Sequence, residues 1–180
     1  MIGKIFKHLR VVLKHKWWVF KLCCMAGIPW RGLVHDLSKF SFTEFSESVK
    51  YFHGHRSPLA ICKETEGYSK AWLHHKGRNK HHFEYWIDPM APEPYPVIPF
   101  VYTVEMICDT LSAGIVYQGK NWKPDYQLGY FKARPDRNYI NPKIVAILED
   151  VYNEIADKGD LKTVINNKHL REIYDRHVNS

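Results

Sequence analysis

The segment LVHDLSKFS, Leu33 to Ser41, places an imidazole, a carboxylate and an ammonium close together. His35 and Asp36 are adjacent, and Lys39 lies about one helical turn after Asp36. Imidazole and carboxylate ligands suit a first-row divalent cation, and an ammonium suits the oxygens of a phosphate. The segment therefore predicts a cation site that faces an anionic substrate.

Other side chains that can bind metals lie on both sides of this segment. His15 precedes it, and Asp109 follows in the apolar segment VEMICD, one turn after Glu105. A carboxylate among apolar residues needs a partner, and a metal is one such partner. Four more histidines lie between these positions: His74, His75, His81 and His82.

The two histidine pairs cannot all face one point if they lie on helices. Neighbouring helical side chains point about 100° apart, so one member of each pair can face a cation while the other turns away. We expect His75 and His82 to be the ligands. His74 and His81 are the alternatives within the pairs, and Glu105 is a further candidate.

Helices must position these residues, since no segment alternates polar and apolar residues as an exposed strand would. Apolar periodicity predicts helices over 2–26 and 100–117, and the caps Asn141 and Gly159 delimit another. The mostly apolar face of the first helix is formed by Ile5, Leu9, Val12, Leu13, Lys16, Phe20 and Cys23. We expect shorter helices over 31–40, 44–52 and 69–79, and a last one over 161–177. Residues 54–67 and 118–142 are predicted to be mainly loop, and five prolines make 88–100 an extended connection. The sequence thus predicts an all-α fold.

The composition predicts one folded domain over residues 1–180. Hydrophobic residues make up 45% of the chain, and the formal net charge is +7. A basic chain suits an anionic partner. Four cysteines without regular spacing favour a reducing, cytoplasmic setting. The apolar run Trp17–Trp30 is short for a membrane span and contains Lys21, so we expect a buried helix there and no membrane partner.

The order His15, His35-Asp36, histidine pairs, Asp109 resembles the HD-domain superfamily. Those proteins are all-helical and metal-dependent, and most are phosphohydrolases acting on nucleotides and other phosphate esters. HDLSK resembles the superfamily's motif, in which a lysine follows His-Asp. The resemblance covers roughly residues 8–116. It implies a helical bundle of HD-domain type, and the C-terminal part that the sequence predicts to be loop-rich lies outside it.

The resemblance also implies roles for individual residues. His15, His35, Asp36 and Asp109 would hold a metal, and histidines of the pairs would hold a second one. The chain is similar, more closely, to a family of small bacterial and phage proteins that carries HDLSKFS, a double His-His segment ending in EYW, and VEMICD. That similarity implies a shared site without naming an activity.

The implied function is a metal-dependent phosphohydrolase. One or two divalent ions (Zn, Mn, Fe, Co or Ni) would lower the pKa of a water that attacks phosphorus. Asp36 and Lys39 would be catalytic, with Lys39 stabilising charge on the phosphoryl oxygens. The substrate would be an anionic small molecule, and Arg78, Lys132 and Arg134 are candidates to bind its other groups.

Two other functions compete with this one. A branch of the same superfamily uses a six-ligand set of this order in di-iron oxygenases, which iron content and oxygen dependence would reveal. The other is a basic helical module that binds nucleic acid and carries only a structural metal. Salt-sensitive DNA binding that survives chelation would favour it. The sequence leaves the oligomeric state open.

Overall fold

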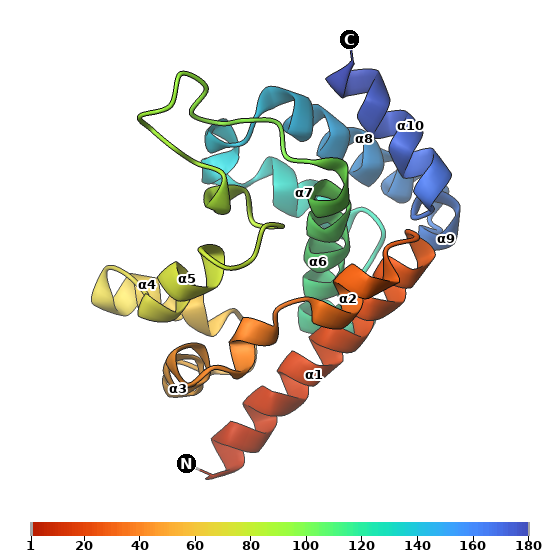
Figure 1. Ribbon diagram of the computed structural model, residues 1–180. Coiled ribbons are helices and arrows are strands. Elements are labelled where there is room, and N and C mark those ends of the chain that lie inside the picture. Colours follow the sequence, from red (N-terminus) through yellow and green to blue (C-terminus); the bar gives the residue numbers. More distant parts are fainter. Residues whose placement is uncertain (1, 180) are drawn as a thin grey trace.

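A computed structural model describes residues 2–179, and within them it contains helices, turns and loops but no strand (Figure 1). The predicted all-α fold is confirmed. Figure 1 shows α6, Phe100–Gln118, near the centre, and α1, Ile2–Met25, packed against it along the lower right edge. The helices within residues 42–76 lie to one side of this pair, and those within residues 126–178 lie to the other.

Helix α1, Ile2–Met25, agrees with the predicted helix, but its buried face differs from the apolar face that the sequence suggests. The buried residues include two histidines, His8 and His15, together with Val12, Val19, Leu22 and Cys23. Leu13 is exposed instead. The apolar run Trp17–Trp30 is only partly buried, because Trp17 and Trp30 face outward.

The helix expected over 31–40 is interrupted. Helix α2, Pro29–Val34, ends before His35, and a 3₁₀ helix, η1, continues over Leu37–Phe40. Asp36 between them has a φ of 52°, the one non-glycine residue with positive φ among those described. Asp tolerates this left-handed conformation better than most residues do. The sharp turn directs both His35 and Asp36 into the interior, which a continuous helix would not do.

Three short helices form the layer that carries the histidine pairs. Ser41 caps α3, Phe42–Lys50, and Ser69 caps α5, Lys70–Lys76, as their hydroxyls accept hydrogen bonds from backbone amides. Between them, residues expected to be mainly loop form α4, Pro58–Glu66. Helix α5 ends at Gly77, so His81 and His82 lie beyond it in a turn that leads to η2, Phe83–Tyr85.

Helix α6, Phe100–Gln118, forms the centre of the core and buries most of its length. By length and composition it is the one helix among residues 2–179 that could cross a membrane. However, 61% of that apolar window is buried inside the fold, as in the core helix of a globular domain.

The C-terminal part contains more helix than the sequence predicts between 118 and 142. It includes α7, Tyr126–Lys132, and two 3₁₀ helices, η3 (Gly119–Asn121) and η4 (Pro135–Tyr139). Helix α8, Pro142–Lys158, has the predicted caps. The last predicted helix is divided into α9, Leu161–Val164, and α10, Asn167–Val178.

Gly32 determines how closely α2 approaches α1. A Cβ at this position would lie 2.7 Å from the Cβ of Cys23 and 2.9 Å from the Cα of Phe20. Only glycine allows this contact, and α2 leads directly into the His35-Asp36 turn.

We predict that Gly32→Ala destabilises the protein by about 1–3 kcal/mol, the usual cost of overpacking a core. It should also weaken metal binding, because α2 must move. Thermal unfolding and metal titration measure both effects. Gly129→Ala in α7 is the control, because a Cβ there meets nothing within 4 Å. Equal stability of the two variants would contradict the prediction.

Candidate metal centre

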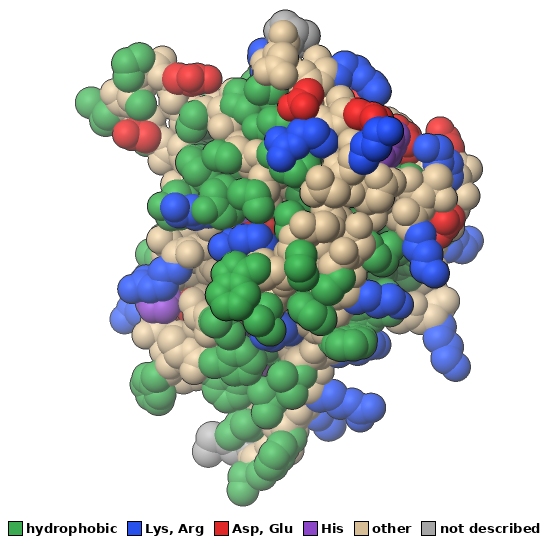
Figure 2. Space-filling model, turned by 45° about the vertical axis from the view of Figure 1, so that its right-hand side comes forward, with side chains coloured by type: hydrophobic (Ala, Val, Ile, Leu, Met, Phe, Trp, Pro, Cys, Tyr) green, Lys and Arg blue, Asp and Glu red, His purple; other side chains and the backbone are tan. Residues whose placement is uncertain are grey.

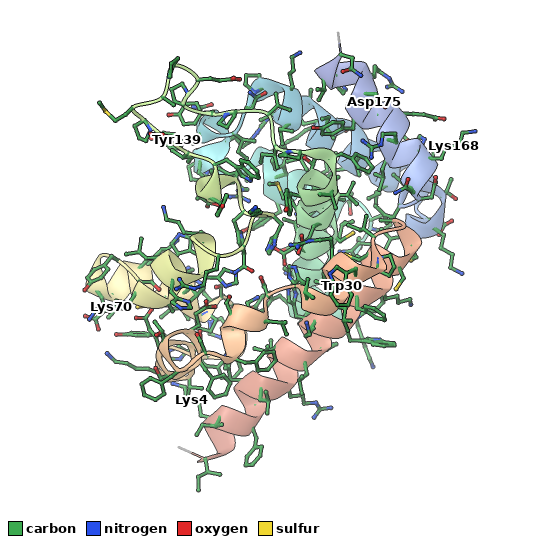
Figure 3. All side chains as sticks on the ribbon, in the orientation of Figure 1. Lys4, Trp30, Lys70, Tyr139, Lys168 and Asp175 are labelled. Carbon is green, nitrogen blue, oxygen red and sulfur yellow. The ribbon has the colours of Figure 1, made fainter. Side chains whose placement is uncertain are left out.

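The candidate donors come from four separate parts of the fold. His15 lies on α1, His35 and Asp36 in the α2–η1 turn, and Asp109 on α6. His75 lies on α5, followed by His81 and His82 in the turn after it. Figure 3 shows nitrogen- and oxygen-bearing side chains gathered in the interior where these elements meet.

One donor group contains His15, His35, Asp36 and Asp109. The Nε2 atom of His15 lies 3.0 Å from Asp109 Oδ1. The Nε2 atom of His35 lies 3.1 Å from Asp36 Oδ2 and 3.4 Å from Asp109 Oδ1. We call these four residues the first donor group.

The second donor group contains Asp36, His75, His81 and His82. Asp36 Oδ1 lies 3.3 Å from the Nε2 atom of His75 and 3.4 Å from that of His81. The Nε2 atoms of His75 and His82 are 2.9 Å apart. The ring of Trp72 packs edge-on against His82 and covers this group.

Asp36 is common to both groups and divides its oxygens between them. Its Oδ2 faces His35, and its Oδ1 faces His75 and His81. A carboxylate placed in this way can bind one cation with each oxygen. The geometry therefore accommodates either one ion or two neighbouring ions.

The donor atoms fit a metal better than they fit one another. Donors about 2.1 Å from a shared cation lie roughly 3.0–3.4 Å apart, which matches the separations above. Several of these atoms are buried and make no hydrogen bond of normal geometry, although they lie close to one another or to Lys39. They include both oxygens of Asp36 and the Nε2 atoms of His15, His35 and His81. Buried polar atoms without partners are costly, and a cation at their common centre would satisfy them together.

Glu105 supports the site from behind. Its Oε1 lies 3.0 Å from Nδ1 of His35 and 3.2 Å from Nδ1 of His81, so both rings turn their Nε2 atoms toward the donors. Arg31 donates to Glu105 Oε2 at 2.7 Å and fixes the carboxylate. Such outer carboxylates orient the histidine ligands of metal sites and make them more basic. We therefore assign Glu105 to ring orientation.

Glu44 plays the corresponding part for His75, and sequence reasoning missed it. Its Oε2 lies 2.7 Å from Nδ1 of His75, and its Oε1 lies 2.6 Å from Nδ1 of His74. The signal in the sequence was ambiguous. Ser41-x-x-Glu44 also matches a capping box, which would send this carboxylate back to the helix start.

The carboxylates of the centre are ionised although they are buried. Burial alone would raise their pKa values. His35 and Lys39 outweigh it and hold the pKa of Asp36 well below its usual value. The neighbouring imidazoles of His15 and His35 do the same for the pKa of Asp109. The pKa of Glu105 falls to about 2 beside His35 and His81. The centre thus concentrates negative charge that cations must balance.

Two histidine donors are uncharged near neutral pH. Burial, then the nearby Lys39, lowers the pKa of His15. Burial, then His81 and His75, lowers the pKa of His82 well below its usual value. A neutral imidazole keeps the lone pair that a metal requires. For His35 burial acts in the same direction, but Asp36, Asp109 and Glu105 outweigh it and raise the pKa.

The structure brings together most of the residues that the sequence singled out. The two donor groups, joined by Asp36, contain His15, His35, His75, His82 and Asp109 as predicted, and His81 in addition. Both members of the second pair are included because they lie in a turn, where the helical 100° rule does not apply. His74 lies outside both groups and is held by Glu44.

The predicted substrate-binding cations lie in different places. The Nζ atom of Lys39 is 2.5 Å from Asp36 Oδ2, at the edge of the centre. Arg78 is exposed and donates to the carbonyl of His74. Lys132 and Arg134, with Arg137, line a separate groove of about 780 Å³ that contains none of the donors.

The sequence as a whole identifies a family. Residues 4–154 match a family described as a family of unknown function, DUF5662. The chain belongs to this family. No curated protein and no solved structure matches the chain. The matched range includes both donor groups, Glu44 and Glu105.

We predict that Glu105→Gln lowers metal affinity about 10- to 100-fold, the usual effect of losing an outer carboxylate. Metal titration followed by thermal stability would measure it. Glu154→Gln is the matched control, because Glu154 pairs with His169 at 2.7 Å outside the donor groups. Unchanged affinity in Glu105→Gln would contradict the assignment of this residue.

Alanine variants of neighbouring histidines should differ in the amount of metal that they bind. His75→Ala should lose bound metal, whereas His74→Ala should keep it, although both side chains bond to Glu44. The His81→Ala and His82→Ala variants should each bind metal more weakly. Elemental analysis of the four purified variants gives the answer, and a loss confined to His74→Ala would refute the second donor group.

Proposed function

We propose that this protein is a metal-dependent hydrolase of phosphate esters. The observation that carries the proposal is the position of Asp36, which faces both donor groups and also pairs with the ammonium of Lys39. Metal-binding atoms and a cation suited to phosphate thus share one buried carboxylate. The resemblance to HD-domain phosphohydrolases in the order of these residues supports the same function.

The donor set limits which metals fit. Imidazole nitrogens and carboxylate oxygens are present without thiolate, which favours Zn, Mn, Fe, Co or Ni over softer ions. A divalent cation held there would supply Lewis acidity toward a phosphoryl oxygen and toward water. The protein contributes fixed donors, since Glu105 and Glu44 orient three of the histidine rings.

Lys39 is the residue best placed to meet a substrate anion. It lies on η1 with 28% of its side chain exposed, whereas 4% of the Asp36 side chain is exposed. Burial would lower its pKa, but Asp36 and Asp109 raise it, so the ammonium stays charged. A fixed positive charge beside the donors would stabilise the charge that develops on phosphoryl oxygens during hydrolysis.

The first donor group is partly exposed to solvent beside Lys39. The side chains of His15 and Asp109 are 11% and 15% exposed, whereas those of His35 and His81 are fully buried. An ester would therefore approach from the side of Lys39, His15 and Asp109. The groove lined by Lys132 and Arg134 is a separate surface, and Arg134 there is already paired with Asp136.

The first test is metal content followed by activity. The protein purified without chelators, or reconstituted, should hold a first-row divalent metal and hydrolyse members of a phosphate ester panel; metal removal should abolish turnover. Asp36→Asn is the informative variant, because asparagine also tolerates the left-handed turn but lacks the charge. It should keep the helical fold and lose metal. Full metal binding by Asp36→Asn would refute the shared-carboxylate site.

Oxygen consumption and DNA binding, measured on the same purified protein, separate the two alternative functions. Turnover that requires iron and consumes oxygen, with no hydrolysis of any ester, would identify an oxygenase. Salt-sensitive DNA binding by the metal-free protein, without turnover, would instead favour a nucleic-acid module.

We predict that Lys39→Ala retains its metal but loses on the order of 10²-fold in rate, as when a transition-state donor is removed. Lys39→Arg should recover only part of the rate, because the planar guanidinium places its charge differently. Lys123→Ala, at an exposed lysine outside the centre, is the control. A normal rate in Lys39→Ala would show that this ammonium has no part in turnover.

A further inference from the structure

The net positive charge of the chain comes from its N-terminal segment, residues 1–35. The whole chain has 26 Lys and Arg and 19 Asp and Glu, giving a net charge of +7. Seven of the cations and none of the carboxylates lie in residues 1–35, so the rest of the chain is balanced. The first two carboxylates, Asp36 and Glu44, are both buried. The surface of α1 and α2 is therefore positive without local compensation.

The exposed cations of α1 form a ridge along the helix. Lys7, Arg10, Lys14 and Lys21 follow one another at intervals of three, four and seven residues, and all four are exposed. The other cations of this segment are engaged within the protein. Lys4 and Lys16 donate to backbone carbonyls, and Arg31 binds Glu105. The ridge is thus the part of the positive charge that is available to a partner.

An apolar stripe runs beside this ridge. Ile2, Phe6, Leu13 and Trp17 also share one face of α1 by their spacing, and each is at least half exposed. Because Gly32 lets α2 pack directly on α1, the exposed Trp30, Leu33, Leu37 and Phe40 of α2 and η1 extend the stripe sideways. Figure 2 shows hydrophobic side chains over this region, flanked by Lys and Arg. Trp30 is labelled on α2 in Figure 3.

We propose that this face, the apolar stripe with its basic ridge, docks the protein on an anionic membrane surface. Helices that lie in a membrane interface combine Trp, Phe and Leu on one side with Lys and Arg on the other. The apolar side chains would enter the headgroup boundary while the basic ridge meets acidic lipid headgroups. The short run Trp17–Trp30 cannot span a bilayer, but its two outer tryptophans can lie in the interface.

Other occupants fit this face less well. A symmetric dimer would bring two equally basic surfaces together without a carboxylate between them, which is unfavourable. A nucleic acid would match the ridge but leave the exposed Ile2, Leu13 and Leu33 beside it without an apolar counterpart. A lipid bilayer offers both negative charge and an apolar layer at the required depth.

The test is flotation of the full-length protein with vesicles of phosphatidylcholine alone or with about one-third phosphatidylglycerol, near physiological ionic strength. The protein should float with the anionic vesicles and remain unbound with the neutral ones. Lys14→Gln/Lys21→Gln should lower partitioning about 25-fold, because each cation near the surface contributes roughly a factor of five. Phe6→Ala/Trp17→Ala should lower it at least about tenfold.

Two matched controls make the test specific. Lys162→Gln/Lys168→Gln removes the same charge from exposed sites on α9 and α10, and Met90→Ala/Tyr139→Ala removes exposed apolar side chains elsewhere. Both should float like the parent protein. Circular dichroism and metal content should be unchanged in all four variants, because none of these residues lies in the donor groups.

Several results would overturn the proposal. Absence of binding to anionic vesicles would refute it, as would an equal loss in the control variants. A parent dimer that Phe6→Ala/Trp17→Ala converts to monomers, without vesicle binding, would assign the face to a second copy. Duplex DNA binding that depends on Lys14 and Lys21 but not on Trp17, without vesicle binding, would assign it to nucleic acid.

Discussion

The carboxylate of Asp36 is the group on which the rest of the centre depends. It is buried and ionised, and its two oxygens face histidines from different directions. A charge in such a place is costly unless opposite charges and hydrogen bonds surround it. The α2–η1 turn, the approach of α5 and the position of Lys39 all place positive or metal-binding groups around this residue.

Two carboxylates outside the donor groups, Glu105 and Glu44, link the position of the donors to the packing of the helices. Glu105 on α6 and Glu44 on α3 hydrogen-bond to the Nδ1 atoms of histidine rings, and Arg31 on α2 donates to Glu105. The centre is therefore supported by α2 and α6 on one side and by the α3–α5 layer on the other. A shift of any one of these helices would move several donor atoms at once, so the packing and the metal site are coupled.

The proposed chemistry and the proposed docking face rest on neighbouring parts of one segment. Helix α1 turns His15 inward and its basic ridge outward, and η1 turns Lys39 toward the centre while Leu37 and Phe40 face solvent. The inner side of this segment carries His15 and Lys39 of the proposed catalytic centre. Its outer side is an exposed surface that is apolar and positively charged. The two proposals use different residues and stand or fall separately.

The sequence by itself determined the all-α fold, the caps at Asn141 and Gly159, and most of the candidate donors, because helix periodicity and residue chemistry are local properties. It could not determine that Asp36 adopts a left-handed turn, that His81 as well as His82 faces the centre, or that Glu44 holds two histidines. It also misplaced Leu13 and the two outer tryptophans in the core. Those features depend on how distant helices pack, which only the tertiary structure decides, since a side chain's partner is set by position in space and not by spacing along the chain.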